Sequence, residues 1–284
     1  MSSEPERSNR TAAYFDYQMG RRPSQAPAHL SRVLYIPRHY DNTVHLPIYE
    51  VGHRYRDAVQ GCLLGSTVYT TTLGSMETPH GDRMEDQAVY LADIRRSEEE
   101  DVEIHLCKRE LASRGEHVDL NMTSNSFDDT SAVTIKSGEG PMKMSTSFPI
   151  ANSTRGRKSI KHPYFALTGL NTTTEKPGEH VPYVRLEWQI DPKDGILRYT
   201  LYRIDETVGK TICAIYHHKH WELSLSLTYS EGVLLLPDTE HSLRLEGIVV
   251  ASLLGVLVQL RKLDEVTSNR RGRGWGCLRK MIHW

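Results

Sequence analysis

The chain has 284 residues, with 35 Lys and Arg against 36 Asp and Glu, and its formal net charge is −1. This balance excludes a chain-wide attraction to nucleic acid or anionic lipid, so a function of that kind needs a local basic patch. Hydrophobic residues make up 38% of the sequence, which is low for a fully compact chain. We therefore expect one large or two small folded units together with much loop and tail.

Residues 1–30 are polar with few aliphatic side chains, so we expect a disordered N-terminal arm. The arm lacks the apolar stretch of a secretory signal. No run reaches the roughly eighteen apolar residues needed to cross a bilayer, so we expect no transmembrane segment. The expected setting is intracellular and cytoplasmic, either free or peripheral at a membrane. The four cysteines are far apart, which excludes a disulfide framework or a zinc cluster.

The first half of the chain is rich in Val, Ile, Tyr and Thr, and turn residues separate the apolar segments. These features are typical of short strands. The expected strands are 32–37, 43–51, 66–74, 86–94, 102–108, 117–124, 131–138 and 142–148. Pro47 lacks a backbone N–H, so it favours an edge position for the second strand.

Residues 151–162 are small, polar and basic, and we expect a linker or a long loop there. Regularly spaced strands with turn signals between them follow. They are expected at 164–170, 183–190, 196–204, 209–218, 221–229 and 233–236. Connections this short favour antiparallel pairing, because a parallel crossover needs a dozen or more residues.

A helix is expected over residues 239–263, with Asp238 or Thr239 as its N-cap. Its second half is apolar on every side, which indicates burial on every side or contact with lipid. The apolar stretch 248–260 would be only about 20 Å long, too short for a bilayer. We therefore expect the helix inside a sheet, and a charge at Val250 or Leu254 should prevent folding.

The predicted fold class is mainly β: an antiparallel β-barrel or strongly curved sheet closed around one buried C-terminal hydrophobic helix. The expected domain covers residues 31–265, with a basic disordered tail at 266–284. Whether residues 31–138 share the barrel with 163–263 stays open at this point.

Two segments carry a resemblance to a known group. They are GKTICAIYHHKHWELSLSLTY and, after it, the helix LRLEGIVVASLLGVLVQLRK. Short antiparallel strands followed by a nearly all-apolar helix resemble the tubby C-terminal-like group, which includes the tubby domain, phospholipid scramblases, LURP-one-related proteins and uncharacterised fungal members. The resemblance covers residues 140–263 well and 31–138 loosely.

The resemblance implies a barrel of about a dozen strands around a central helix, and a non-enzymatic binding module. Tubby domains bind phosphoinositides through paired basic side chains, and no such pair is identified here. The Pro-rich and Cys-rich segments and the calcium-site carboxylates of scramblases are not identified either.

Two basic segments could contact an anionic partner. The loop residues are Arg155, Arg157, Lys158 and Lys161, and the tail residues include Arg270, Arg271 and Arg273. If the barrel forms, the loop is the best candidate for an anionic lipid headgroup. The tail interleaves Arg and Gly with Trp, which suits single-stranded RNA or a membrane surface, and a solvated extension is the plainer alternative.

His218 and His220 would share one face of a strand, as two metal ligands do. No third ligand is evident, and a surface turn explains the histidines equally well. We therefore expect no metal and no cofactor, with His218 and His220 as the only candidates.

The sequence has no G-x-S-x-G, P-loop, H-E-x-x-H or strand-to-helix GxGxxG motif, so no catalytic residue is proposed. Three functions stay open. The first is a non-enzymatic tubby-like module that binds anionic phospholipid or a protein partner. The others are an RNA-associated protein acting through its tail, and an enzyme of unrecognised type.

Overall fold

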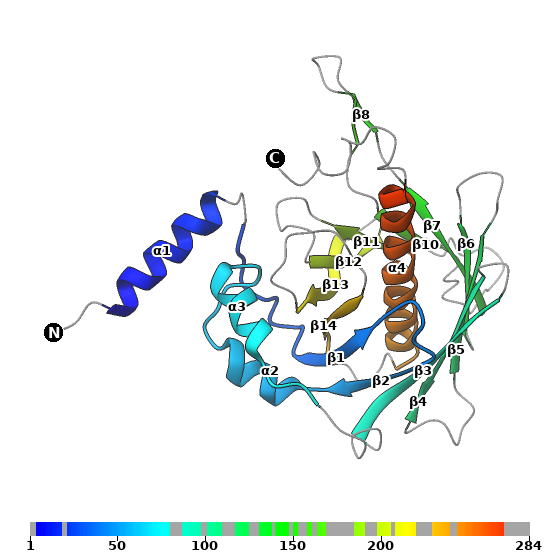
Figure 1. Cartoon of the computed structure of the whole chain (residues 1–284), viewed down its shortest axis with the longest axis horizontal. Coiled ribbons are helices and arrows are strands. Elements are labelled where there is room, and N and C mark those ends of the chain that lie inside the picture. Colours follow the sequence, from blue (N-terminus) through cyan, green and yellow to red (C-terminus); the bar gives the residue numbers. More distant parts are fainter. Residues whose placement is uncertain are drawn as a thin grey trace.

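The structure is a computed structural model of the whole chain. It describes residues 4–18, 22–79, 87–97, 101–109, 117–124, 131–137, 140–147, 150–152, 158–160, 164–168, 185–190, 198–205, 208–219, 229–238 and 243–269. Twelve strands form a closed barrel in the order β1-β14-β13-β12-β11-β10-β7-β6-β5-β4-β3-β2, and all neighbours are antiparallel (Figure 1). The prediction of a mainly β, antiparallel barrel is therefore confirmed.

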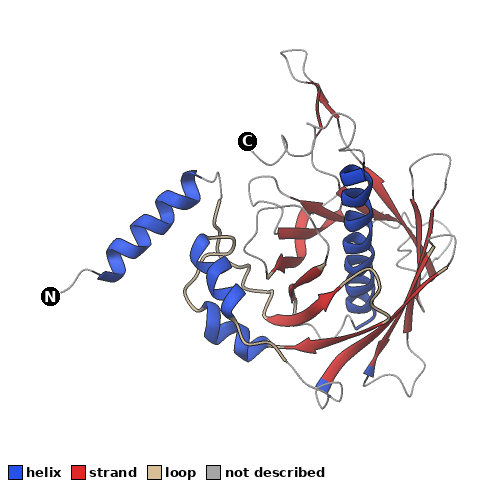
Figure 2. Ribbon diagram, viewed as in Figure 1, coloured by secondary structure: helices blue, strands red, loops and turns tan. Residues whose placement is uncertain are grey.

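The barrel strands are β1 (Arg32–His39), β2 (His45–Glu50), β3 (Ala88–Arg96), β4 (Val102–Lys108), β5 (His117–Ser124), β6 (Ser131–Ser137), β7 (Gly140–Ser147), β10 (Tyr164–Thr168), β11 (Arg185–Ile190), β12 (Arg198–Asp205), β13 (Gly209–His218) and β14 (Ser230–Leu236). A separate two-stranded sheet pairs β8 (Ile150–Asn152) with β9 (Lys158–Ile160). The helices are α1 (Glu4–Gln18), α2 (Gly52–Val59), α3 (Thr67–Ser75) and α4 (Leu243–Asn269), drawn in blue in Figure 2.

The barrel closes where its first and last strands meet. In β1, Arg32 pairs with Leu236 and Leu34 with Leu234 of β14, while Leu34 and Tyr35 also pair with β2. The strands before residue 148 and those after residue 163 therefore belong to one barrel.

Inward side chains of all twelve strands share a single hydrophobic cluster with α4. The apolar residues of the helix in this cluster are at most 3% exposed: Ile248, Val249, Val250, Ala251, Leu253, Leu254, Val256, Leu257 and Val258. Because apolar residues surround the helix, burial against strands removes far more apolar surface from water than one flat sheet face could.

A second cluster lies on the outer face of the closing strands, under α2 and α3. In β1, Leu34 and Ile36 belong to the inner cluster, whereas Val33 and Tyr35 belong to the outer one. Successive strand residues point to opposite faces, so β1 and β14 are buried on both sides and read as continuous apolar runs. The two helices are thereby fixed to the barrel at its closure.

The strand predicted at 66–74 is wrong, because this segment forms α3. Its β-branched composition favours a strand, but the Ser66 side chain caps the helix by accepting from the Tyr69 backbone N–H. Tyr69 and Leu73 are four residues apart, share one helix face and are buried in the outer cluster. Helix α2 was not predicted at all.

Other boundaries also differ from the sequence expectations. Helix α1 occupies part of the predicted disordered arm, and Asp16 at its end accepts from the Thr67 N–H and hydroxyl. Strand β2 pairs on both sides, so it is no edge strand. Its pairing with β1 is confined to Tyr49 and Glu50, so Pro47 costs no hydrogen bond to β1.

The predicted disordered tail 266–284 begins too early, because α4 continues to Asn269. Several predicted segments, including the rest of the tail, lie wholly or partly outside the described residues. The predicted strand 221–229 falls there except for its last residue, as do residues 239–242 at the predicted helix start and much of 151–162. Among the described helices, none combines the length and apolar character required to cross a membrane.

Gly232 provides a test of how tightly the barrel closes. A Cβ at Gly232 would lie 2.2 Å from the His217 backbone oxygen and 2.7 Å from the Tyr216 ring. The backbone oxygen cannot move without disturbing the pairing of β13 with β14, so Gly232→Ala should lower the free energy of unfolding by about 3 kcal/mol. Urea denaturation measures this loss.

Gly255→Ala is the matched control for that substitution. Its Cβ would meet the Leu120 Cδ1 at 2.9 Å and the Met144 Cε at 3.3 Å, which are ends of flexible side chains. Alanine also favours the helix over glycine by about 1 kcal/mol. The loss should therefore be much smaller, and equal losses for the two variants would contradict this account.

Candidate functional site

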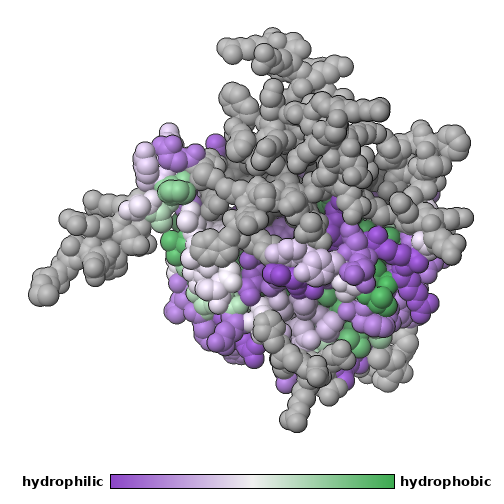
Figure 3. All heavy atoms as spheres, viewed as in Figure 1, coloured by the Kyte–Doolittle hydropathy of each residue, from purple (hydrophilic) through white to green (hydrophobic). Residues whose placement is uncertain are grey.

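A surface pocket of about 530 Å³ opens where β2 leads into α2. Its lining comprises Ser31, Arg32, Tyr49, Glu50, Val51, Gly52, His53, Arg54, Arg56, Pro79, Gln87 and Asp238. A second pocket of about 660 Å³ shares Arg54 and Pro79 with it and continues along α2 and α3. Figure 3 shows a mainly hydrophilic surface over α2 and the neighbouring strands.

The N-terminus of α2 lies in the wall of this pocket. Val51 occupies the N-cap position and supplies no side-chain hydrogen bond, and the first turn contains no acidic residue. The first backbone N–H groups of a helix have no partner within the helix and carry its positive partial charge. The start of α2 therefore offers N–H donors that no side chain in the described part of the chain caps.

Two arginines add positive charge at the same place. Arg56 belongs to the last turn of α2, but its side chain extends back along the helix and its Nη2 donates to His53 Nδ1 at 3.2 Å. A Cβ at Gly52 would lie 3.5 Å from Arg56 Nη1. Within the described residues, neither Arg54 nor Arg56 pairs with a carboxylate. A guanidinium near a helix N-terminus is unfavourable unless an anion lies there too.

The acidic side chains of the pocket are partly neutralised. Glu50 accepts from Arg32 at 3.0 Å, and Arg32 also pairs with Glu246 of α4. Burial lowers the pKa of Arg32, but the charges of Glu246 and Glu50 outweigh it and raise that pKa above its ordinary value. Asp238 is exposed. Arg54 and Arg56 are the pocket arginines for which the described residues provide no carboxylate partner.

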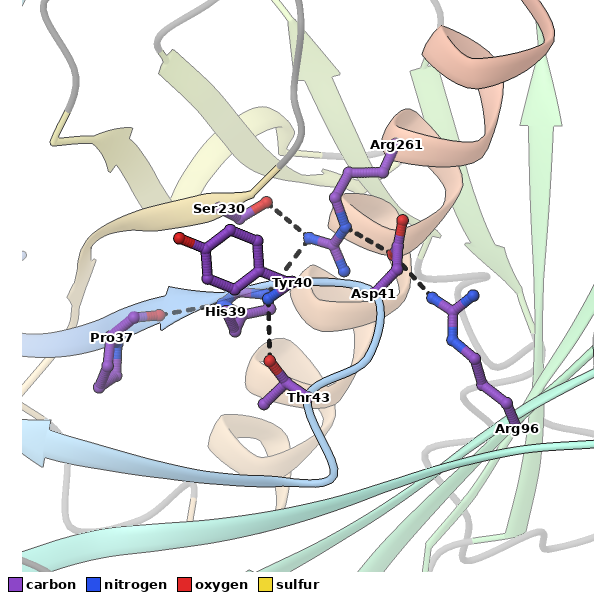
Figure 4. Close-up of polar contacts among 8 residues, drawn as sticks. All are labelled: Pro37, His39, Tyr40, Asp41, Thr43, Arg96, Ser230 and Arg261. Carbon is purple, nitrogen blue, oxygen red and sulfur yellow. Dashed lines mark hydrogen bonds and ion pairs between the residues drawn. The ribbon is translucent and has the colours of Figure 1, made fainter.

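A second polar cluster surrounds Arg261 of α4, which is 1% exposed (Figure 4). Its Nε donates to Asp41 Oδ1 at 2.8 Å, and its Nη1 donates to Ser230 Oγ at 2.7 Å. Arg96 also donates to Asp41, at 2.7 Å. A buried guanidinium is strongly destabilising unless a carboxylate and hydrogen-bond acceptors lie beside it. These contacts therefore hold α4 against the loop after β1.

His39 completes the Arg261 cluster as a neutral imidazole. Its Nδ1 donates to the Pro37 carbonyl at 3.0 Å, so its Nε2 is the acceptor that faces Arg261 Nη1 at 3.4 Å. Burial and then the nearby Arg261 charge lower the pKa of His39 to about 4. Burial raises the pKa of Asp41, but its contacts with Arg261 and Arg96 outweigh this and keep it below its ordinary value.

Of the two histidines predicted as metal candidates, His218 and His220, the structure describes His218. His218 points into the barrel, where its Nε2 lies 2.9 Å from the Tyr199 hydroxyl. His217 faces the opposite side and packs on the Tyr69 ring at 4.8 Å. His220 lies outside the described residues.

Most of the predicted lipid-binding residues also fall outside the described part of the chain. These are Arg155, Arg157, Lys161, Arg270, Arg271 and Arg273, whereas Lys158 begins β9. The pocket at α2 was missed because no helix was predicted there. The feature of the sequence that could have indicated the pocket is GHRYR at residues 52–56, directly after a predicted strand. These five residues include two arginines and a histidine and no acidic residue.

Comparison with protein-family models, with curated proteins and with solved structures found no match for the chain.

The buried His39 should make stability depend on pH. An unfolded histidine has a pKa near 6.5, so between about pH 4 and 6.5 the unfolded chain binds a proton that folded His39 excludes. Stability should therefore fall as the pH drops through this window, by up to about 3 kcal/mol from this group.

Urea denaturation of the wild type and of His39→Gln between these pH values measures the effect. Gln cannot titrate, so the variant should show a flatter dependence of unfolding free energy on pH. The difference in slope isolates His39 from other buried histidines such as His217, whose pKa burial also lowers. Parallel curves would contradict the assignment.

Proposed function

We propose that the protein is a non-enzymatic binding module that takes a phosphate-bearing anionic ligand in the pocket at the start of α2. The observation that carries the proposal is the uncapped N-terminus of α2 together with Arg54 and Arg56, which have no carboxylate partner among the described residues. An anion at this point would accept from backbone N–H groups and from guanidinium groups at once.

Phosphate suits this arrangement better than other anions. It offers three acceptor oxygens and close to two charges, and arginine binds it through two parallel hydrogen bonds. The shared chemistry is a phosphate group, whose source is either a lipid headgroup at a membrane surface or a free phosphate compound. The sequence-based hypothesis of an anionic phospholipid partner falls within this class.

The fold supports the same reading. A closed twelve-stranded barrel whose inner cluster includes α4 supports kinship with the tubby C-terminal-like group, and we infer that α4 is the central helix on which the barrel closes. The basic residues at 155–161 and 270–273 remain part of this proposal as further contacts with an anionic surface. A protein partner and RNA remain the alternatives.

Arg54→Gln and Arg56→Gln should each weaken ligand binding by about tenfold or more, because a hydrogen bond to a charged group contributes about 1.5–3 kcal/mol. Both side chains are exposed, so the variants should fold normally. Co-sedimentation of the full chain with vesicles that contain phosphatidylserine or a phosphoinositide measures binding to lipid. Titration with inorganic phosphate and a soluble inositol phosphate measures binding to the free group.

Lys136→Gln is the matched control, because Lys136 is an exposed lysine on β6, which β3, β4 and β5 separate from β2. It removes the same charge and should leave binding unchanged. Binding to vesicles but not to the soluble compounds would identify a lipid headgroup as the ligand. Binding to vesicles and to the soluble compounds would identify a free phosphate compound. If all three variants weakened binding equally, the loss would follow from the change in net charge alone, and the proposed anion site would be rejected.

A further inference from the structure

We propose that His105, His117 and Asp119 form a binding site for a divalent transition metal, zinc by preference, on the outer face of the barrel. The three side chains each offer one ligand atom, and these atoms all lie within 4.8 Å of one another. The site lies on β4 and β5, away from the pocket at α2, and does not depend on the function proposed for that pocket.

The pairing of β4 with β5 brings the three residues together. His105 is the direct cross-strand partner of Asp119, and His117 lies two residues before Asp119 on the same face of β5. The chain neighbours of His105 and Asp119 point inward and are buried in the core: Ile104, Leu106, Val118 and Leu120. The two strands therefore hold the three ligands on a rigid surface, so little conformational freedom is lost when an ion binds.

Asp119 already contacts both imidazoles with separate oxygens. Its Oδ1 lies 2.6 Å from His105 Nδ1, and its Oδ2 lies 3.4 Å from His117 Nε2. The ring centroids of the two histidines are 4.9 Å apart. Two imidazole nitrogens thus converge on one carboxylate, which is a set of three zinc ligands.

A nearby pair shows what a simple ion pair looks like on this barrel. His45 of β2 lies 2.7 Å from Asp93 of β3, and Asp93 is in turn the cross-strand partner of His105. One histidine suffices to pair with one carboxylate. A metal ion that accepts a lone pair from each ring and from the carboxylate would account for a second histidine beside the same aspartate.

The chemistry of the donors selects the kind of ion. Two nitrogens and one carboxylate suit zinc and its neighbours among the transition metals, whereas calcium and magnesium prefer oxygen ligands throughout. All three side chains are partly or well exposed. Three protein ligands leave a fourth tetrahedral position for water or for a group from a partner.

Isothermal titration of the metal-stripped full chain with zinc tests the proposal. We expect one site per chain that calcium does not compete for, and cobalt substituted there should give the strong visible absorption of tetrahedral coordination. His105→Ala and Asp119→Asn should weaken zinc binding by more than about 100-fold, because even residues that only support ligands contribute 10–100-fold.

His45→Ala is the matched control, since the chain has 14 histidines that could bind zinc weakly. This substitution removes an exposed histidine that forms an ion pair with Asp93 on the outer face of the barrel. Zinc affinity should stay at the wild-type value. The substituted side chains are on the surface, and thermal unfolding followed by circular dichroism checks that each variant folds. Absence of stoichiometric zinc binding, or equal weakening by His45→Ala and His105→Ala, would overturn the site.

Discussion

Two charged residues of α4, Glu246 and Arg261, need hydrogen-bonding and oppositely charged partners on the strands and loops around them. This requirement constrains how the helix and the barrel are assembled. Glu246 in the first turn accepts from Tyr90 at 2.6 Å and pairs with Arg32, while Lys108 lies 4.0 Å away. Arg261 follows fifteen residues later, about 22 Å along the helix axis, and pairs with Asp41. Between them, Trp188 donates to Ser252 at 3.0 Å. An apolar helix among apolar strands could slide or rotate at little cost, but leaving either charge unpaired would be expensive.

The ion pair between Arg32 and Glu246 also connects the core to the candidate anion site. Arg32 pairs with Glu246 of α4 and also with Glu50, which ends β2 next to the start of α2. The outer cluster under α2 and α3 then fixes the position of Arg54 and Arg56 relative to the barrel. The pocket is therefore built on an element whose position the core determines, as a preorganised binding site requires.

The barrel also gathers polar residues on its outer face. Asp93, His105, Asp119 and Lys136 are consecutive cross-strand partners on β3 to β6, and His45 of β2 extends the row. Because each inward neighbour is apolar, the strands cannot shift by one residue without exposing the core. The register that buries the core thus also sets the spacing of the histidines and aspartates outside it.

Local sequence pattern was sufficient to determine most of the secondary structure. Strands predicted at 102–108, 117–124 and 209–218 have the observed bounds, because alternation of apolar and polar residues is a property of each segment. The apolar run of α4 was equally plain. The same reasoning failed for α3, where the Ser66 cap and packing of Tyr69 and Leu73 on the barrel override the β-branched composition.

Contacts between distant segments were decided by the tertiary structure alone. Asp41 and Arg261 are 220 residues apart, and His105 and Asp119 meet only because β4 and β5 pair in one register. Periodicity reports which face of a segment is apolar, but not which other segment covers it. That choice depends on how the whole chain buries its apolar surface while pairing its charges. A barrel could therefore be predicted, but the pairing of β1 with β14 that closes it, the α2 pocket and the histidine–aspartate cluster lay beyond the sequence.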